Sequence, residues 1–137
     1  MQWYTDHNNY MPLCSGKMKG ETQSLSGNVY LFPQWQGQCV HIIGGMDPSR
    51  AFQFHNNTCV NPMGEIYSGK FDTGTALTAG NRYYVPGGTS AKGFPYNKGN
   101  WSDWQTTGQD LGSTVFDAVP NASVMVGWGR SLLGLPN

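Results

Sequence analysis

The stretch WSDWQTTGQDLGSTV, residues Trp101–Val115, says most about the fold. Ser102 is followed three residues later by Gln105, which is the pattern of a capping box, and Gly108 is a typical stop signal. These residues predict one short helix, Asp103–Thr107, and no other segment has a comparable helix signal. A single helical turn in a chain of short strand-like runs indicates an all-β architecture.

The remainder of the chain consists of short runs rich in β-branched and aromatic residues, each bounded by Gly, Pro, Asn or Asp. Within one run, Phe52 and Phe54 alternate with polar residues, which is the period of two expected for a strand. The predicted strands are Val29–Phe32, Cys39–Ile43, Ala51–His55, Glu65–Phe71, Arg82–Val85, Thr114–Phe116 and Val124–Val126.

A weak internal repeat suggests that these strands stack on one another. A shift of about two dozen residues, the size of one solenoid repeat, superimposes similar residues. The matched pairs are Tyr30 with Phe54, Ile42 with Ile66, Ile43 with Tyr67, and Gly45 with Gly69.

Three segments carry a resemblance to a known superfamily: FHNNT (Phe54–Thr58), EIYSGKFDTG (Glu65–Gly74) and WQTTGQDLGST (Trp104–Thr114). They resemble the C-terminal coils of right-handed parallel β-helix proteins, which include pectate-lyase-like and alginate-lyase-like enzymes. The resemblance implies an all-β fold, a right-handed parallel β-helix (solenoid) segment spanning residues 1–137. Residues 86–100 would be a loop insertion, and the segment would be the C-terminal part of a longer solenoid.

The composition disfavours two classes of partner. Charged residues make up 12% of the chain and the formal net charge is zero, so there is no basic surface to attract DNA or RNA. No apolar run is long enough to span a bilayer, and no basic amphipathic helix suggests binding to its surface. We therefore expect neither a nucleic-acid nor a membrane partner.

The sequons favour an extracellular location, whereas the cysteines alone do not settle the compartment, because buried free thiols are also common. Cys14, Cys39 and Cys59 allow at most one internal disulfide, and the sequence leaves its pairing open. Three Asn-X-Ser/Thr sequons are candidate glycosylation sites. They begin at Asn56, Asn100 and Asn121.

No complete active site is evident. A β-eliminating lyase needs a base of lowered pKa and a cation that neutralises the substrate carboxylate. The polar cluster candidates are Asp6, His7, Lys17 and Lys19, but no spacing ties any of them to a partner, and a solvated turn explains them equally well. Asp103 and Asp110 fit structural roles, at the first helical turn and in a tight turn respectively. The histidines have no metal-ligand spacing, so neither a metal nor another cofactor is expected.

Aromatic residues offer a second kind of site, because their faces pack against sugar rings. The candidates for carbohydrate contact are Trp35, Tyr96 and Trp101, whereas Trp104 and Trp128 are expected to fill the core.

These observations favour an extracellular module associated with carbohydrate binding or scaffolding, with a glycan or polysaccharide, or other copies of the same protein, as its partner. One alternative is a structural subunit of an extracellular filament or shell, built by end-to-end or lateral stacking. A polysaccharide lyase or hydrolase is the third interpretation, and the scarcity of charged residues argues against it.

Overall fold

The computed structural model describes residues 4–7, 10–12, 16–19, 23–31, 38–44, 52–62, 65–69, 76–90 and 100–136. The strands are β1 (Tyr4–His7), β2 (Tyr10–Pro12), β3 (Gly16–Lys19), β4 (Gln23–Ser26), β5 (Val29–Leu31), β6 (Gln38–Gly44), β7 (Phe52–His55), β8 (Thr58–Val60), β9 (Glu65–Gly69), β10 (Ala76–Ala79), β11 (Arg82–Tyr84) and β12 (Thr114–Phe116). The helices are the 3-10 turn η1 (Gly88–Ser90), α1 (Trp101–Thr106) and α2 (Ala122–Leu132).

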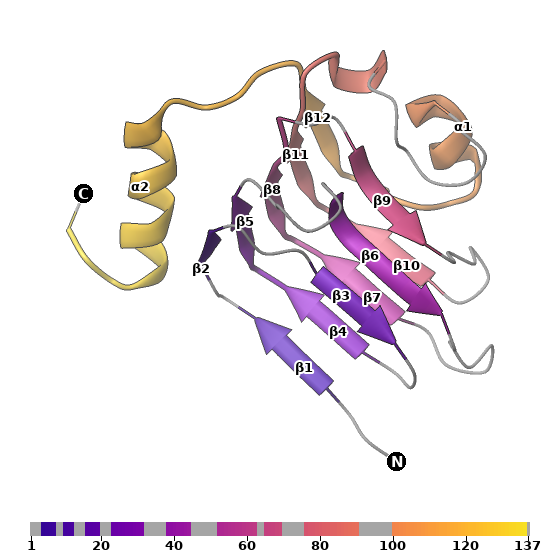
Figure 1. Cartoon of the computed structure of the whole chain (residues 1–137), viewed down its shortest axis with the longest axis horizontal. Helices are drawn as coiled ribbons and strands as arrows, with labels where there is room; N and C mark the ends of the chain where they lie inside the picture. Colours follow the sequence, from indigo (N-terminus) through magenta and orange to yellow (C-terminus); the bar gives the residue numbers. More distant parts are fainter. Residues whose placement is uncertain are drawn as a thin grey trace.

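The strands form three small sheets in which all pairing is parallel (Figure 1). The sheet orders are β1-β4-β7-β10, β12-β11-β8-β5-β2 and β3-β6-β9, which we call sheets A, B and C. Consecutive strands up to β11 therefore belong to different sheets. Each of them pairs with the strand that comes three strands earlier or later in the sequence.

The expected fold class is wrong. The strands are divided among three separate small sheets and are accompanied by two α-helices, so the molecule is a small mixed α/β domain rather than a single right-handed parallel β-helix solenoid. The sequence correctly indicated short strands, since six of the predicted runs overlap β5, β6, β7, β9, β11 and β12. The resemblance implied how the whole chain winds, which three short segments do not determine.

The register differs from the one implied by the repeat. Tyr30 lies opposite Cys59 rather than Phe54, and Ile42 lies opposite Gly69 rather than Ile66. The repeat fails because the connections between paired strands differ in length. Offsets between paired positions include 29 residues for Asn28 and Asn57 and 24 for Asn57 and Asn81.

The predicted helix exists but begins earlier than expected. The N-cap of α1 is Asn100, whose side chain accepts a hydrogen bond from the backbone N–H of Asp103, while the Asp103 carboxylate accepts one from the Asn100 N–H. The capping box is therefore Asn100 with Asp103, two residues before the expected Ser102 with Gln105. Residues 86–100, predicted as a loop insertion, contain η1, and residues 91–99 lie outside the described part.

The predicted strand Val124–Val126 is instead part of α2. Asn121 caps this helix by accepting a hydrogen bond from the Val124 N–H at 3.0 Å. Met125 of α2 packs with Val29, Leu31 and Val60 on one face of sheet B. Valines and glycines are weak helix formers, so the cap and this packing outweigh the local β propensity.

Aromatic side chains hold α2 against sheet B. Trp128 lies 5.4 Å from Tyr84 between ring centroids, and Tyr84 stacks on Phe116 at 4.5 Å. The guanidinium of Arg82 lies 6.0 Å from the centroid of the Trp128 ring, within the range of a cation–π contact. The opposite face of sheet B contributes Tyr30, Cys59 and Tyr83 to the main core.

Candidate functional site

The most densely bonded polar group of the described structure is the carboxylate of Asp110, which is fully buried. Its Oδ2 accepts hydrogen bonds from the Tyr67 hydroxyl at 2.7 Å and from Trp104 Nε1 at 2.8 Å. Its Oδ1 accepts from Asn81 Nδ2 at 3.0 Å, the Tyr83 hydroxyl at 3.0 Å and Ser113 Oγ at 2.7 Å. A buried charge is tolerated only when it is hydrogen-bonded in this way.

The turn that carries Asp110 is fastened to β10. The Asp110 N–H donates to the carbonyl of Thr78 at 2.7 Å, and Gln109 Oε1 accepts from the Thr78 N–H at 3.0 Å. The next residue, Leu111, makes a parallel bridge with Ala79. This turn therefore occupies the outer edge of β10 and fixes the position of the carboxylate.

Aromatic rings surround the carboxylate. Trp104 packs on Tyr67 with ring centroids 5.3 Å apart, and Trp101 meets Tyr83 edge-on at 6.3 Å. All four side chains are buried, and the hydroxyls of Tyr67 and Tyr83 also contact each other. Helix α1 thus closes the core at this end of the molecule (Figure 1).

Burial, together with the negative charge of Asp110, raises the pKa of both Tyr67 and Tyr83 well above that of a free tyrosine. Above about pH 10 the unfolded chain releases the two protons while the folded chain keeps them, so the free energy of unfolding falls as the pH rises. We expect a loss of up to about 1.4 kcal/mol per pH unit for each tyrosine until the folded-state pKa is reached. Urea unfolding at a series of alkaline pH values measures this slope.

The matched control is a phenylalanine at either position. Tyr67→Phe and Tyr83→Phe each remove one of the two ionisations, so each should flatten the alkaline slope relative to the wild type. A slope unchanged in both variants would show that other groups cause the alkaline instability.

A ladder of asparagines connects this site to the neighbouring turns. The backbone N–H of Asn28 donates to Asn57 Oδ1, and that of Asn57 donates to Asn81 Oδ1, both at 2.9 Å. The N–H of Asn81 donates to Ser113 Oγ at 2.7 Å, and Ser113 in turn donates to Asp110. The three asparagines are buried, so the ladder satisfies backbone groups that water cannot reach.

The residue that precedes each Asn or Ser of this ladder explains why the turns can align. Gly27, Asn56, Gly80 and Gly112 all have positive φ, a conformation that Gly and Asn adopt most readily. A side chain at Gly80 would also place a Cβ 2.5 Å from Asn56 Oδ1. The sequence signal for the ladder is therefore a Gly or Asn followed by Asn or Ser, and this signal is independent of the hydrophobic periodicity.

A disulfide joins two of the sheets. Cys39 of β6 and Cys59 of β8 form it, so two of the three candidate cysteines are paired, while Cys14 lies outside the described residues. Both half-cystines are fully buried in the main core. The bond fastens sheet C to sheet B.

The network around Asp110 stabilises the fold and is closed to substrates. The carboxylate has no exposed surface, so a ligand could reach it only if the five side chains that donate to it moved away. Asp110 was expected to order the backbone amides of its turn, whereas its carboxylate accepts hydrogen bonds from five side chains. Sequence reasoning did not identify Tyr67, Tyr83 or Asn81 as its partners.

The other predicted site residues are dispersed. Asp6 and His7 lie on β1 in sheet A, whereas Lys17 and Lys19 lie on β3 in sheet C. Trp35 and Tyr96 lie outside the described residues. Trp101, predicted to contact carbohydrate, is only 8% exposed because it packs into the core, so it offers little surface to a sugar ring. Trp104 is buried, as expected.

The sequon asparagines lie at the surface. Asn56, Asn100 and Asn121 are all exposed, and the latter two cap α1 and α2.

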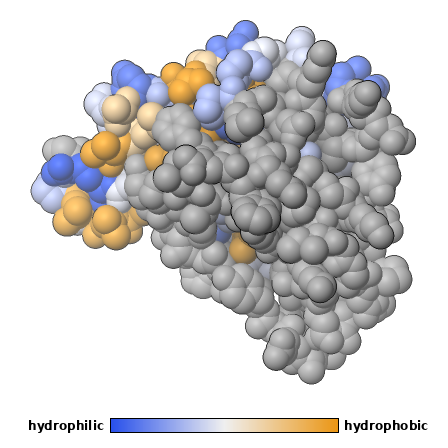
Figure 2. Space-filling view, in the orientation of Figure 1, coloured by the Kyte–Doolittle hydropathy of each residue, from blue (hydrophilic) through white to orange (hydrophobic). Residues whose placement is uncertain are grey.

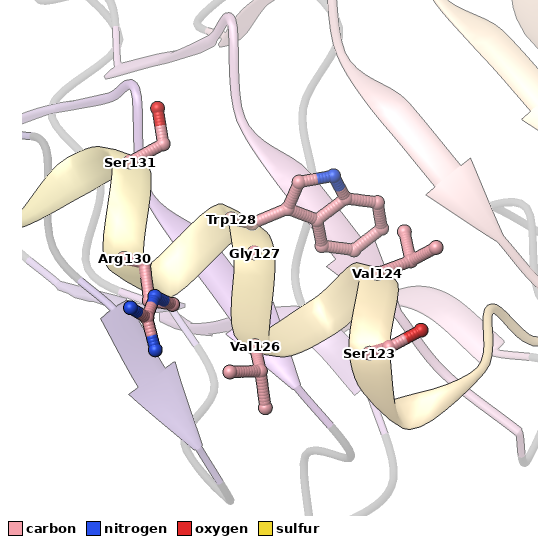
Figure 3. Close-up of a pocket in the computed structure, with 7 residues that line it drawn as sticks. All are labelled: Ser123, Val124, Val126, Gly127, Trp128, Arg130 and Ser131. Carbon is pink, nitrogen blue, oxygen red and sulfur yellow. The ribbon is translucent and has the colours of Figure 1, made fainter. Parts of the chain in front are cut away.

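An open hollow of about 560 Å³ borders α2 (Figure 3). Val124 and Trp128 point to one side of the helix, and Val126 and Arg130 point to another, so the side chains do not converge on a common point. Arg130 is the charged residue of this lining, and its Nε donates to the carbonyl of Pro136 at 2.6 Å. The hollow offers no acid–base pair to a substrate.

Apolar side chains are exposed over and beside this helix, as Figure 2 shows in orange. They include Val124, Val126, Leu133 and Leu135.

Within the part of the chain that the structure describes, no three His, Cys, Asp or Glu residues come together as metal ligands would. None of the described helices has the length and apolarity needed to cross a membrane. Comparisons with protein-family models, with curated proteins and with solved structures found no match to this chain.

Proposed function

We propose that this chain is an extracellular scaffold module that associates with a second copy of itself and performs no catalysis. The observation that carries the proposal is the difference between the two ends of the sheets. At one end the turn containing Asp110, strand β12 and helix α1 cover β10, β11 and the core. At the other end, the outermost strands of sheets A, B and C among the described residues are β1, β2 and β3.

These three strands differ in how well they could accept another strand. Pro12 removes a backbone N–H from β2, and Lys17 and Lys19 place charges on β3. Proline and lysine are the usual protection of an edge strand against pairing. Strand β1, with the sequence YTDH, has neither. It is the outer strand best suited to pair with another chain.

A second copy is the partner that this geometry favours. In sheet A the opposite edge strand, β10, is covered by the turn that contains Asp110, so copies meet through β1 of both molecules. A contact between identical surfaces has two-fold symmetry. Two-fold pairing of one strand with itself is antiparallel, which places Thr5 opposite Asp6 of the other copy and ends the assembly at a dimer. The Cys39–Cys59 disulfide supports an oxidising, extracellular setting.

Sedimentation over a range of protein concentrations tests the proposal. We expect the wild type to form a dimer that does not grow further, and Thr5→Asp to be monomeric because it places a second carboxylate directly opposite Asp6 of the other copy. Thr114→Asp is the matched control, since Thr114 is exposed on β12 at the opposite end, and this variant should dimerise like the wild type. A monomeric wild type, or a Thr5→Asp variant that still dimerises, would reject the proposal.

A further inference from the structure

We infer that Asn121 carries an N-linked glycan and caps α2 at the same time. This inference rests on the extracellular setting proposed above, but it does not depend on dimerisation through β1. The residues Asn121-Ala122-Ser123 form a sequon, and all three are exposed at the start of α2.

The two functions use different atoms of one side chain. Asn121 Oδ1 accepts hydrogen bonds from the Val124 N–H at 3.0 Å and from Ser123 Oγ at 2.7 Å. The glycan bonds to Nδ2, and no described residue is hydrogen-bonded to that atom. The amide carbonyl survives glycosylation, so the helix retains its cap.

The modification itself is a glycosyl transfer. An oligosaccharyltransferase moves the oligosaccharide from a lipid-linked diphosphate donor to Asn121. A bond forms between Nδ2 and the anomeric carbon, the bond from that carbon to the diphosphate oxygen breaks, and Nδ2 loses one proton. The lipid diphosphate is the leaving group.

The other two sequons are less favourable. The Nδ2 of Asn56 lies 3.3 Å from a ring nitrogen of His55, and Thr58 of the same sequon is buried beneath the turn. Asn100 caps α1 in the same manner, but Trp101, the middle residue of that sequon, is buried in the core. Asn121 also begins its helix away from β1, so a glycan there leaves the proposed dimer contact accessible (Figure 1).

Glycopeptide mass spectrometry of the full chain, secreted from eukaryotic cells, tests this inference. We expect the Asn121 peptide of the wild type and of Ser123→Thr, which preserves the sequon, to be glycosylated in most molecules. Ser123→Ala and Asn121→Asp should lose this glycan entirely while keeping a side-chain cap. Their thermal unfolding midpoints should exceed that of Asn121→Ala, which loses both the glycan and the side-chain cap.

An unmodified Asn121 peptide in a secreted chain whose Cys39–Cys59 disulfide has formed would overturn the inference. A glycan that persists in Ser123→Ala would overturn it as well, because the sequon would not be the cause. Sedimentation of the same samples reports separately on dimerisation, so failure of the proposed dimer is distinguishable from failure of the glycan site.

Discussion

Asp110→Ala should destabilise the fold by about 3–5 kcal/mol, because it leaves the donors of four buried side chains and of the partly buried Ser113 without their acceptor. Asp110 also has φ of 51°, a left-handed conformation that costs alanine roughly 1 kcal/mol more than it costs Asp or Asn. Urea unfolding followed by tryptophan fluorescence measures the change, since Trp104 donates directly to this carboxylate.

Two variants separate the lost charge from the lost shape. Asp110→Asn fits the same space and tolerates positive φ, but its amide group must face either Trp104 Nε1 or Asn81 Nδ2, donor against donor. We expect an intermediate loss of about 1–3 kcal/mol. Asp103→Asn removes an exposed carboxylate of equal charge and should cost much less. A loss below about 1 kcal/mol for Asp110→Ala would show that the donors find other partners.

The strands were predictable because their signal is local. Runs such as VYL and FQFH combine β-branched or aromatic residues with flanking turn formers, and this composition is sufficient to indicate extended backbone. The register was not predictable in this way. The pairing of strands depends on the length of each connection, and those lengths vary along the chain. A single fixed shift of the sequence therefore matched aromatic residues whose rings lie close together although their strands are not paired. Tyr30 and Phe54, for example, have ring centroids 5.8 Å apart but lie in different sheets.

Helix α2 was missed for a different reason. The residues ASVMVGWGRSL contain two valines and two glycines, which suggest a strand or a loop when read locally. The helix is favoured by the Asn121 cap and by burial of Met125 against sheet B, and only the cap was visible in the sequence. Read locally, Asn121-Ala122-Ser123 indicates a sequon and not the start of a helix.

The candidate site was partly visible as single residues and not as a network. The sequence indicated a structural aspartate at position 110 and a buried tryptophan at 104. It could not indicate that Tyr67 and Tyr83 reach the same carboxylate, because those side chains come from sheets C and B and meet only through the tertiary fold. Parallel pairing over long sequence separations brings such residues together.

Removing the Cys39–Cys59 bond should lower the free energy of unfolding by about 3 kcal/mol, because the bond closes a loop with a sequence separation of 20 and restricts the unfolded chain. The test variant is the double substitution Cys39→Ala with Cys59→Ala, compared with the wild type in urea under oxidising and reducing conditions. The wild type should lose stability on reduction, whereas the double variant should respond little.

Cys14→Ala supplies the control for this experiment, since it removes the remaining cysteine and leaves the disulfide intact. It should show the same loss on reduction as the wild type, and peptide mapping without reductant should recover Cys39 linked to Cys59 in both proteins. Insensitivity of the wild type to reductant, or a mapped bond that includes Cys14, would contradict the pairing. Either result would also remove the covalent link between sheets B and C. The argument for an oxidising compartment would then fail, because buried free thiols are common in proteins of reducing compartments.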